Sequence, residues 1–181
     1  MDLTLPDPER YQVVALDLGT AYTGLSIWKR GELSLFQEVI TSAEHSSSEA
    51  AAEMFSAIAD ITERHLDRKE PVLCVCEDYA YGSGFFNVIQ AELVGFLKRH
   101  AIENCWIGIV FVAPNTIKRL VTGSGRATKS QVKKAVLKLI GIKISSTHIV
   151  DSLAAFIAYR QIWSCPTEGM YRRAFLLAKI L

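Results

Sequence analysis

The chain has 181 residues, half of them hydrophobic, with a net charge of +1 and four cysteines. This length suits one domain with its own core, and the longest apolar runs are far shorter than the ~20 residues that a membrane span requires. The acidic amino terminus lacks the apolar centre of an export signal and the cysteines lack zinc-type spacing, so we expect reduced core thiols and a cytoplasmic protein.

The first part of the chain predicts three successive strands and a helix. The β-rich runs at 11–18, 24–28 and 32–40 are joined by short turns, which is typical of an antiparallel meander. Ser46 and Glu49 fit a capping box at the start of a helix whose apolar stripe ends before Pro71.

The rest of the chain alternates between strands and helices. Apolar runs predict buried strands at 72–77 and 107–113, and helices are expected at 86–100, 115–122, 129–140 and 147–163. Such alternation adds parallel strands to the meander. We therefore expect an α/β fold with a mixed five-stranded sheet and helices on both faces, the element order of an RNase H-like fold.

We expect one domain over residues 1–181. Its core spans about 12–163, and 164–181 form a C-terminal extension. The apolar residues Leu176, Leu177, Ile180 and Leu181 suggest a short helix in that extension.

Three acidic residues stand where a carboxylate is costly or specifically placed. Asp17 and Glu77 each end an apolar strand, where an ionised carboxylate needs a cation or several hydrogen bonds. Asp151 lies in the first turn of an apolar helix, three residues after His148 and on the same face. Each acid alone could be structural, but together they favour a shared metal site.

Such a set suits two divalent cations about 3.5–4 Å apart, one activating a water and the other stabilising the leaving oxygen. Oxygen ligands favour Mg²⁺, with Mn²⁺ as a substitute. His148 could bind the second ion or orient the attacking water.

The neutral net charge conceals a strong asymmetry. Residues 1–103 carry a balance of −9, residues 104–181 carry +10, and 104–150 contain eight basic residues and no acid. Thr128 and Gln131 fit a capping box for a basic helix that Gly141 would end. Its buried stripe is expected to comprise Val132, Ala135, Val136, Leu139 and Ile140, with its lysines mostly off that stripe. This pattern favours a polyanionic partner such as nucleic acid over a merely solvated surface.

Four segments resemble the RuvC family of junction endonucleases: VVALDLGTAYTGLSIW (13–28), CVCEDYAYGSG (74–84), TGSGRATKSQVKKAV (122–136) and HIVDSLAAFIAY (148–159). The order, spacing and context of these segments agree with the family over about residues 12–160. A bacterial or a phage-type member would fit the resemblance.

The resemblance implies a Mg²⁺-dependent homodimer that resolves four-way (Holliday) DNA junctions by paired symmetric nicks, at the nucleoid of a bacterial or phage-infected cell. It places Asp17, Glu77, His148 and Asp151 in the metal-binding catalytic set. The DNA-contacting residues are expected to be Lys118, Arg119, Arg126, Lys129, Lys133, Lys134, Tyr79 and Tyr81. The family has an aromatic residue three positions after the second acid; here that position is Ala80, so Tyr79, Tyr81, Phe85 or Phe86 is expected to stack on bases.

Other functions fit less well. Residues 15–24 resemble the first phosphate hairpin of actin-like ATPases, but the second hairpin of that class is missing. Residues 123–130 resemble a P-loop, which requires glycine where Thr128 stands, so no nucleotide cofactor is expected. Two alternatives stay open: an RNase H-like nuclease with broader branched-DNA or RNA substrates, and a non-catalytic junction-binding module.

Overall fold

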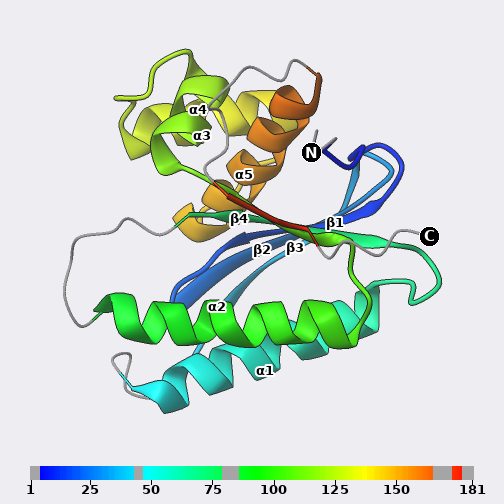
Figure 1. Cartoon of the computed structure of the whole chain (residues 1–181). Coiled ribbons are helices and arrows are strands. Elements are labelled where there is room, and N and C mark those ends of the chain that lie inside the picture. Colours follow the sequence, from blue (N-terminus) through cyan, green and yellow to red (C-terminus); the bar gives the residue numbers. More distant parts are fainter. Residues whose placement is uncertain (1–4, 43–46, 79–85, 165–172, 177–181) are drawn as a thin grey trace.

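The computed structural model describes residues 5–42, 47–78, 86–164 and 173–176 (Figure 1). The strands are β1 (Gln12–Asp17), β2 (Tyr22–Lys29), β3 (Glu32–Ile40), β4 (Val72–Glu77), β5 (Gly108–Val112) and β6 (Arg173–Leu176). The helices are α1 (Ser48–His65), α2 (Phe86–Glu103), α3 (Pro114–Thr122), α4 (Lys129–Ile140) and α5 (Thr147–Ser164).

The strands form one mixed sheet in the order β3-β2-β1-β4-β5-β6. β1 pairs antiparallel with β2 and β2 with β3, whereas β4 runs parallel to both β1 and β5. This confirms the expected meander with parallel additions. The added strand β6 pairs antiparallel with the edge strand β5, so the helix expected around Leu176 is wrong for that residue; 177–181 lie outside the described residues.

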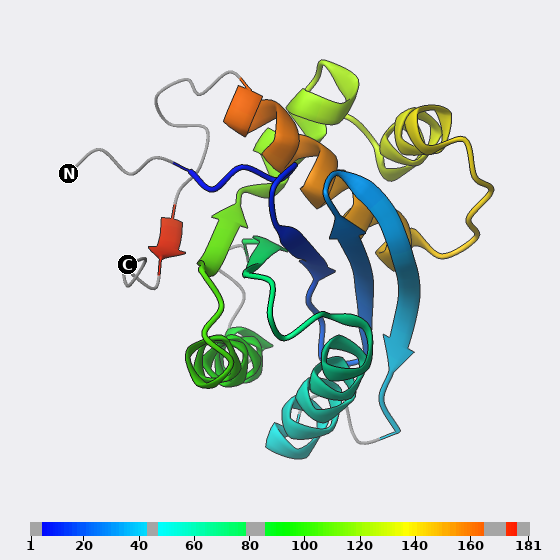
Figure 2. The same cartoon turned by 90° about the vertical axis from the view of Figure 1, so that its right-hand side faces the viewer.

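Helices cover both faces of the sheet (Figures 1 and 2). On one face α5 lies across β1 and β2, with α3 and α4 outside it, and on the other α1 and α2 pack side by side. The alternation of buried strand residues supplies both cores, since Val13 and Ala15 join the α5 cluster while Val14 and Leu16 join the α1–α2 cluster.

α5 is buried on almost every side, which explains why its sequence has no clear polar stripe. Its Phe156 ring stacks on Trp28 of β2 with centroids 3.8 Å apart. Such an aromatic pair adds about 0.5–1.5 kcal/mol to the burial itself. This packing holds α5 against β2 of the sheet.

Side-chain caps mark the starts of α1 and α4, and the cap of α1 differs from the predicted one. The Thr128–Gln131 capping box and the left-handed Gly141 at the end of α4 are confirmed. The cap of α1 is Ser47, whose hydroxyl accepts a bond from the Ala50 amide, one residue later than the Ser46 that we expected. Among the described helices, none is both long enough and apolar enough to cross a membrane.

Candidate active site

Asp17 and Glu77 end neighbouring parallel strands. Leu16 of β1 is the register partner of Cys76 of β4, so the next residue on each strand is one of the two acids. The carboxyl ends of parallel strands meet at one edge of a sheet, where ligand sites commonly form. Both side chains therefore lie at the same end of the sheet, above the buried core.

The first turn of α5 brings the other two candidates to this edge. Ser146, directly before the helix, accepts a bond from the Ile149 amide and donates 2.5 Å to the Glu38 carboxylate of β3. The backbone of His148 lies directly against Gly24 of β2, and a Cβ there would overlap the His148 carbonyl. The helix start is thus seated on β2 through a contact that only glycine allows.

The four candidates line one cleft of about 220 Å³ together with two of the predicted basic residues. The cleft is lined by Asp17, Leu18, Gly19, Tyr22, Glu77, Pro114, Ile117, Lys118, Lys129, Val132, His148 and Asp151. Residues from β1, β4, α3, α4 and α5 therefore converge at one point, although they are spread over 135 positions of the sequence.

Two polar contacts organise the cleft. His148 Nδ1 lies 3.0 Å from Asp17 Oδ2, and Lys129 Nζ lies 3.8 Å from Asp151 Oδ2. The first is a hydrogen bond that fixes the imidazole. The second joins a mostly exposed lysine to the acid and contributes little stability, as surface ion pairs do.

Ionising the three acids costs free energy in this environment, and a bound cation would reduce that cost. Burial, reinforced by the charges of Asp17 and Asp151, raises the pKa of Glu77 to about 8. Burial, with the charge of Asp17, raises the pKa of Asp151 to about 6. Burial also raises the pKa of Asp17, although the hydrogen bond from His148 opposes the shift. Desolvation and mutual repulsion both disfavour the ionised forms, which a divalent ion would stabilise.

The donor chemistry fits a hard divalent cation. Three carboxylates and one imidazole offer the oxygen-rich set that Mg²⁺ or Mn²⁺ prefers. In the described part of the chain, no three His, Cys, Asp or Glu side chains already stand close enough together to hold an ion as they are. These donors would have to move closer together to surround a metal.

The predicted DNA-contacting residues fall into separate groups. Lys118 and Lys129 line the cleft. Lys133 points elsewhere, since its ammonium donates 2.7 Å to the Ser145 carbonyl. Arg126 and Lys134 line a second hollow between α3 and α4, and Arg119 is exposed on α3 and lines neither. The tyrosines Tyr79 and Tyr81, Phe85 and the side chain of Phe86 lie outside what the structure describes.

Sequence reasoning missed Tyr22. Its ring stacks on the His148 imidazole with centroids 5.5 Å apart and planes 6° apart. A signal was present, because Tyr22 lies in the same motif as Asp17 and opens the second strand. The motif was interpreted through its acid and glycines, and the stacking partner is 126 positions away.

Comparisons with known proteins agree with this architecture. The family model described as "Crossover junction endodeoxyribonuclease RuvC" matches residues 13–159. The protein of that name from Mycobacterium bovis is 26% identical over 157 residues, which cover 86% of this chain and 84% of the relative. The one from Koribacter versatilis is 23% identical over 155 residues, 82% of this chain and 91% of the relative.

Two solved structures share the fold. "T. thermophilus RuvC in complex with Holliday junction substrate" superposes with a TM-score of 0.68 at 20% identity, over 84% of this chain and 97% of that one. A second Thermus thermophilus RuvC structure gives a TM-score of 0.66 at 20% identity, over 89% and 98% of the two chains.

Proposed function

The chain belongs to the RuvC family of crossover junction endodeoxyribonucleases, and from that premise we propose that Asp17, Glu77, His148 and Asp151 form its metal-dependent catalytic centre for Holliday junction resolution. The observation that carries the proposal is the convergence of these four side chains in one cleft, where burial raises the pKa of all three acids and the charges of neighbouring acids add to the rise at Glu77 and Asp151. The family is typically metal-dependent.

The bound metal would supply an activated water for attack on the phosphorus and would stabilise the leaving 3′ oxygen. We assign two Mg²⁺ ions to the site, with the three carboxylates as ligands. Asp17 also orients His148 through the 3.0 Å hydrogen bond to Nδ1, which leaves Nε2 as the ring nitrogen for an ion or a water.

The two cleft lysines hold the substrate. Lys118 and Lys129 line the cleft beside the acids, where their charges favour the approach of a phosphate that the carboxylates alone would repel. Lys129 lies close to Asp151 and lowers the pKa of that acid. It thereby supports the ionised form that a metal ligand needs.

We also propose that two copies act together, so that two such clefts nick opposed strands of one junction. Sedimentation of the protein alone and with a junction tests this. One dimer per junction would support paired action, whereas a single chain per junction would contradict it.

Asp17→Asn tests the assigned site. The substitution keeps the size of the side chain but removes a metal-binding charge, so cleavage in Mg²⁺ should fall at least a hundredfold while junction binding in Ca²⁺ or EDTA persists. Asp60→Asn, a change of the same type on α1, is the matched control and should cleave as wild type. Full cleavage by Asp17→Asn would refute the assignment, and loss of binding would make the acid structural.

A further inference from the structure

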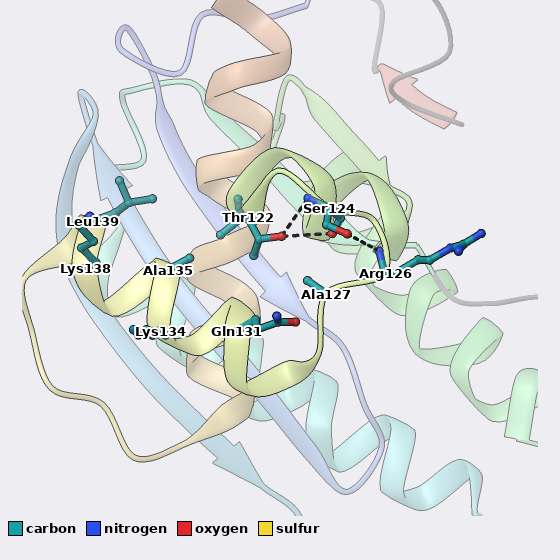
Figure 3. A pocket seen from close by; sticks show the side chains of 10 residues that line it. Thr122, Ser124, Arg126, Ala127, Gln131, Lys134, Ala135, Lys138 and Leu139 are labelled. Atoms are coloured by element: carbon teal, nitrogen blue, oxygen red, sulfur yellow. Dashed lines mark hydrogen bonds between the residues drawn. The ribbon is translucent and has the colours of Figure 1, made fainter.

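A hollow larger than the catalytic cleft lies between α3 and α4. It has a volume of about 620 Å³ and is lined by Val121, Thr122, Ser124, Arg126, Ala127, Gln131, Lys134, Ala135, Lys138 and Leu139 (Figure 3). Its lining contains three cationic side chains and no acid. Apolar residues form much of its surface, and Leu139, which we expected in the buried stripe, is 60% exposed at one end.

The basic residues of α4 face two ways. Lys129 and Val132 line the catalytic cleft, whereas Lys134 and Lys138 line the hollow. Lys133, next to Lys134 in sequence, is bonded to the Ser145 carbonyl instead. Lys133 and Lys134, both expected to contact DNA, therefore point in different directions.

The cations of the hollow are uncompensated. Arg126, Lys134 and Lys138 make no ion pair within the described residues. Lys134 and Lys138 also stand four positions apart on one helix, a like-charged spacing that costs roughly 0.2–0.5 kcal/mol in isolation. Such a cluster gains when a polyanion neutralises it.

The wall that carries these cations is firmly held. The Thr122 hydroxyl donates 2.7 Å to the Lys118 carbonyl, and the Ser124 hydroxyl accepts a bond from the Arg126 amide. Figure 3 shows these loop residues facing α4, with the Arg126 side chain extending outward. The capping box at Thr128 fixes the start of α4. The backbone that carries these cations is therefore fixed before any ligand arrives, which lowers the entropic cost of binding.

We propose that this hollow is a second DNA-binding surface, which holds the sugar–phosphate backbone of a junction arm outside the catalytic cleft; the inference rests on the proposed junction-cutting function. Lys138 lies nine residues beyond Lys129 on α4, a rise of ~14 Å. Phosphates follow one another every ~3.4 Å of duplex axis on each strand. A backbone that follows α4 from the cleft would thus reach the hollow roughly four nucleotides from the scissile phosphate, and the contact would carry position rather than sequence information.

The test is the salt dependence of junction binding by Lys134→Ala/Lys138→Ala. Each lost phosphate contact removes about 0.9 from the log–log slope, so the slope should become less steep by about 1.8. Raising salt fourfold would then weaken binding about tenfold less than for wild type. The control Arg68→Ala/Lys69→Ala removes the same charge from exposed positions outside the hollow and should keep the wild-type slope.

Phosphate ethylation of the junction gives a second measurement, which compares the wild-type protein with the double variant. Interference should appear on an arm about four nucleotides from the nick and should vanish for the double variant. An unchanged slope together with interference confined to the nick would overturn the inference and would point to another anionic partner for the hollow. Paired nicking of the junction by the wild-type protein is measured separately, so that result would leave the proposed function intact. Failure of the wild type to bind junctions would overturn both.

Discussion

Glu77 is the residue whose environment most directly links stability to metal binding. Its pKa is raised to about 8 because it is buried beside Asp17 and Asp151. In the metal-free fold it therefore stays protonated at pH values where the unfolded chain has lost the proton. Its contribution to stability is complete below its ordinary value of 4.5 and disappears as pH rises through about 8.

The metal-free protein should consequently lose stability between pH 5 and 8, by up to roughly 1.4 kcal/mol per pH unit for this one proton. Glu77→Gln should flatten the loss above pH 6, leaving the part below that from Asp151, whose pKa is about 6. Urea unfolding in EDTA across this range measures both. Added Mg²⁺ should stabilise the wild type increasingly as pH rises, because binding releases the proton. Identical pH profiles for wild type and variant would contradict the assigned environment of Glu77.

Tyr22 positions His148 rather than reacting. The hydrogen bond to Asp17 holds one nitrogen of the imidazole, and the parallel tyrosine ring restricts its plane. An aromatic contact of about 1 kcal/mol corresponds to a roughly fivefold effect on rate when it is lost.

Tyr22→Leu should therefore slow single-turnover cleavage about fivefold with little change in junction affinity, whereas Tyr22→Phe should cleave as wild type. The His148 ring-proton resonances should lose their ring-current shift in the leucine variant only. Ile40→Ala is the control, since Ile40 is the exposed cross-strand neighbour of Tyr22 and has no stacking role. A leucine variant as fast as wild type would remove Tyr22 from the site.

Among the elements, the contact between β2 and α5 determines where half of the site lies. Gly24 allows the His148 carbonyl to approach the strand so closely that any side chain would displace the helix start. Overpacking of this kind costs about 1–3 kcal/mol, and displacement of reacting groups costs far more in rate.

Gly24→Ala should thus reduce cleavage at least a hundredfold while lowering stability only by about 1–3 kcal/mol. Circular dichroism on heating and cleavage assays separate the two effects. Gly95→Ala in α2 is a matched control, because a Cβ there meets nothing within 4 Å, and it should leave activity unchanged. Normal cleavage by Gly24→Ala would show that the helix start need not be held there.

Much of this arrangement could be predicted at the level of elements because local patterns determine it. The strand 72–77 and the helix 129–140 were predicted with their observed bounds, as apolar runs and the Thr128 cap mark them directly. The shift from Ser46 to Ser47 shows the limit, since neighbouring serines offer equal caps. β6 escaped prediction because its partner β5 lies about 65 positions earlier, and a four-residue strand carries no periodicity of its own.

In the candidate site, too, features that depend on local sequence patterns could be predicted, whereas features that depend on distant contacts could not. Strand-end and helix-start positions marked Asp17, Glu77 and Asp151 as unusual, and the family resemblance joined them. Leu139 and Tyr22 were misjudged or missed because exposure and stacking depend on which helix lies opposite, a tertiary property. The separate directions of Lys133 and Lys134 likewise depend on the loop at Ser145.

Across the whole molecule, the fold separates an acidic and a basic part of the chain, whose charges nearly cancel in the net charge of +1. The acid-free segment 104–150 builds β5, α3, α4 and the start of α5, so the cations of α3 and α4 lie on the face of the sheet that α5 covers. The acid-rich first part contributes α1 and α2 on the opposite face (Figure 1). The cations of α3 and α4 thus lie on the face that carries the cleft, where they favour the approach of a polyanion such as DNA.

The proposed activity of this cleft is metal-dependent cutting of four-way junctions. The most direct test is nick mapping on a synthetic junction labelled in turn on each strand, in Mg²⁺ and in EDTA, beside duplex, flap and RNA–DNA hybrid substrates. We expect paired nicks at symmetric positions on two opposed strands of the junction, in Mg²⁺ and not in EDTA. Equal cutting of flaps or hybrids would instead indicate a broader nuclease, and junction binding without any cutting would contradict the claim.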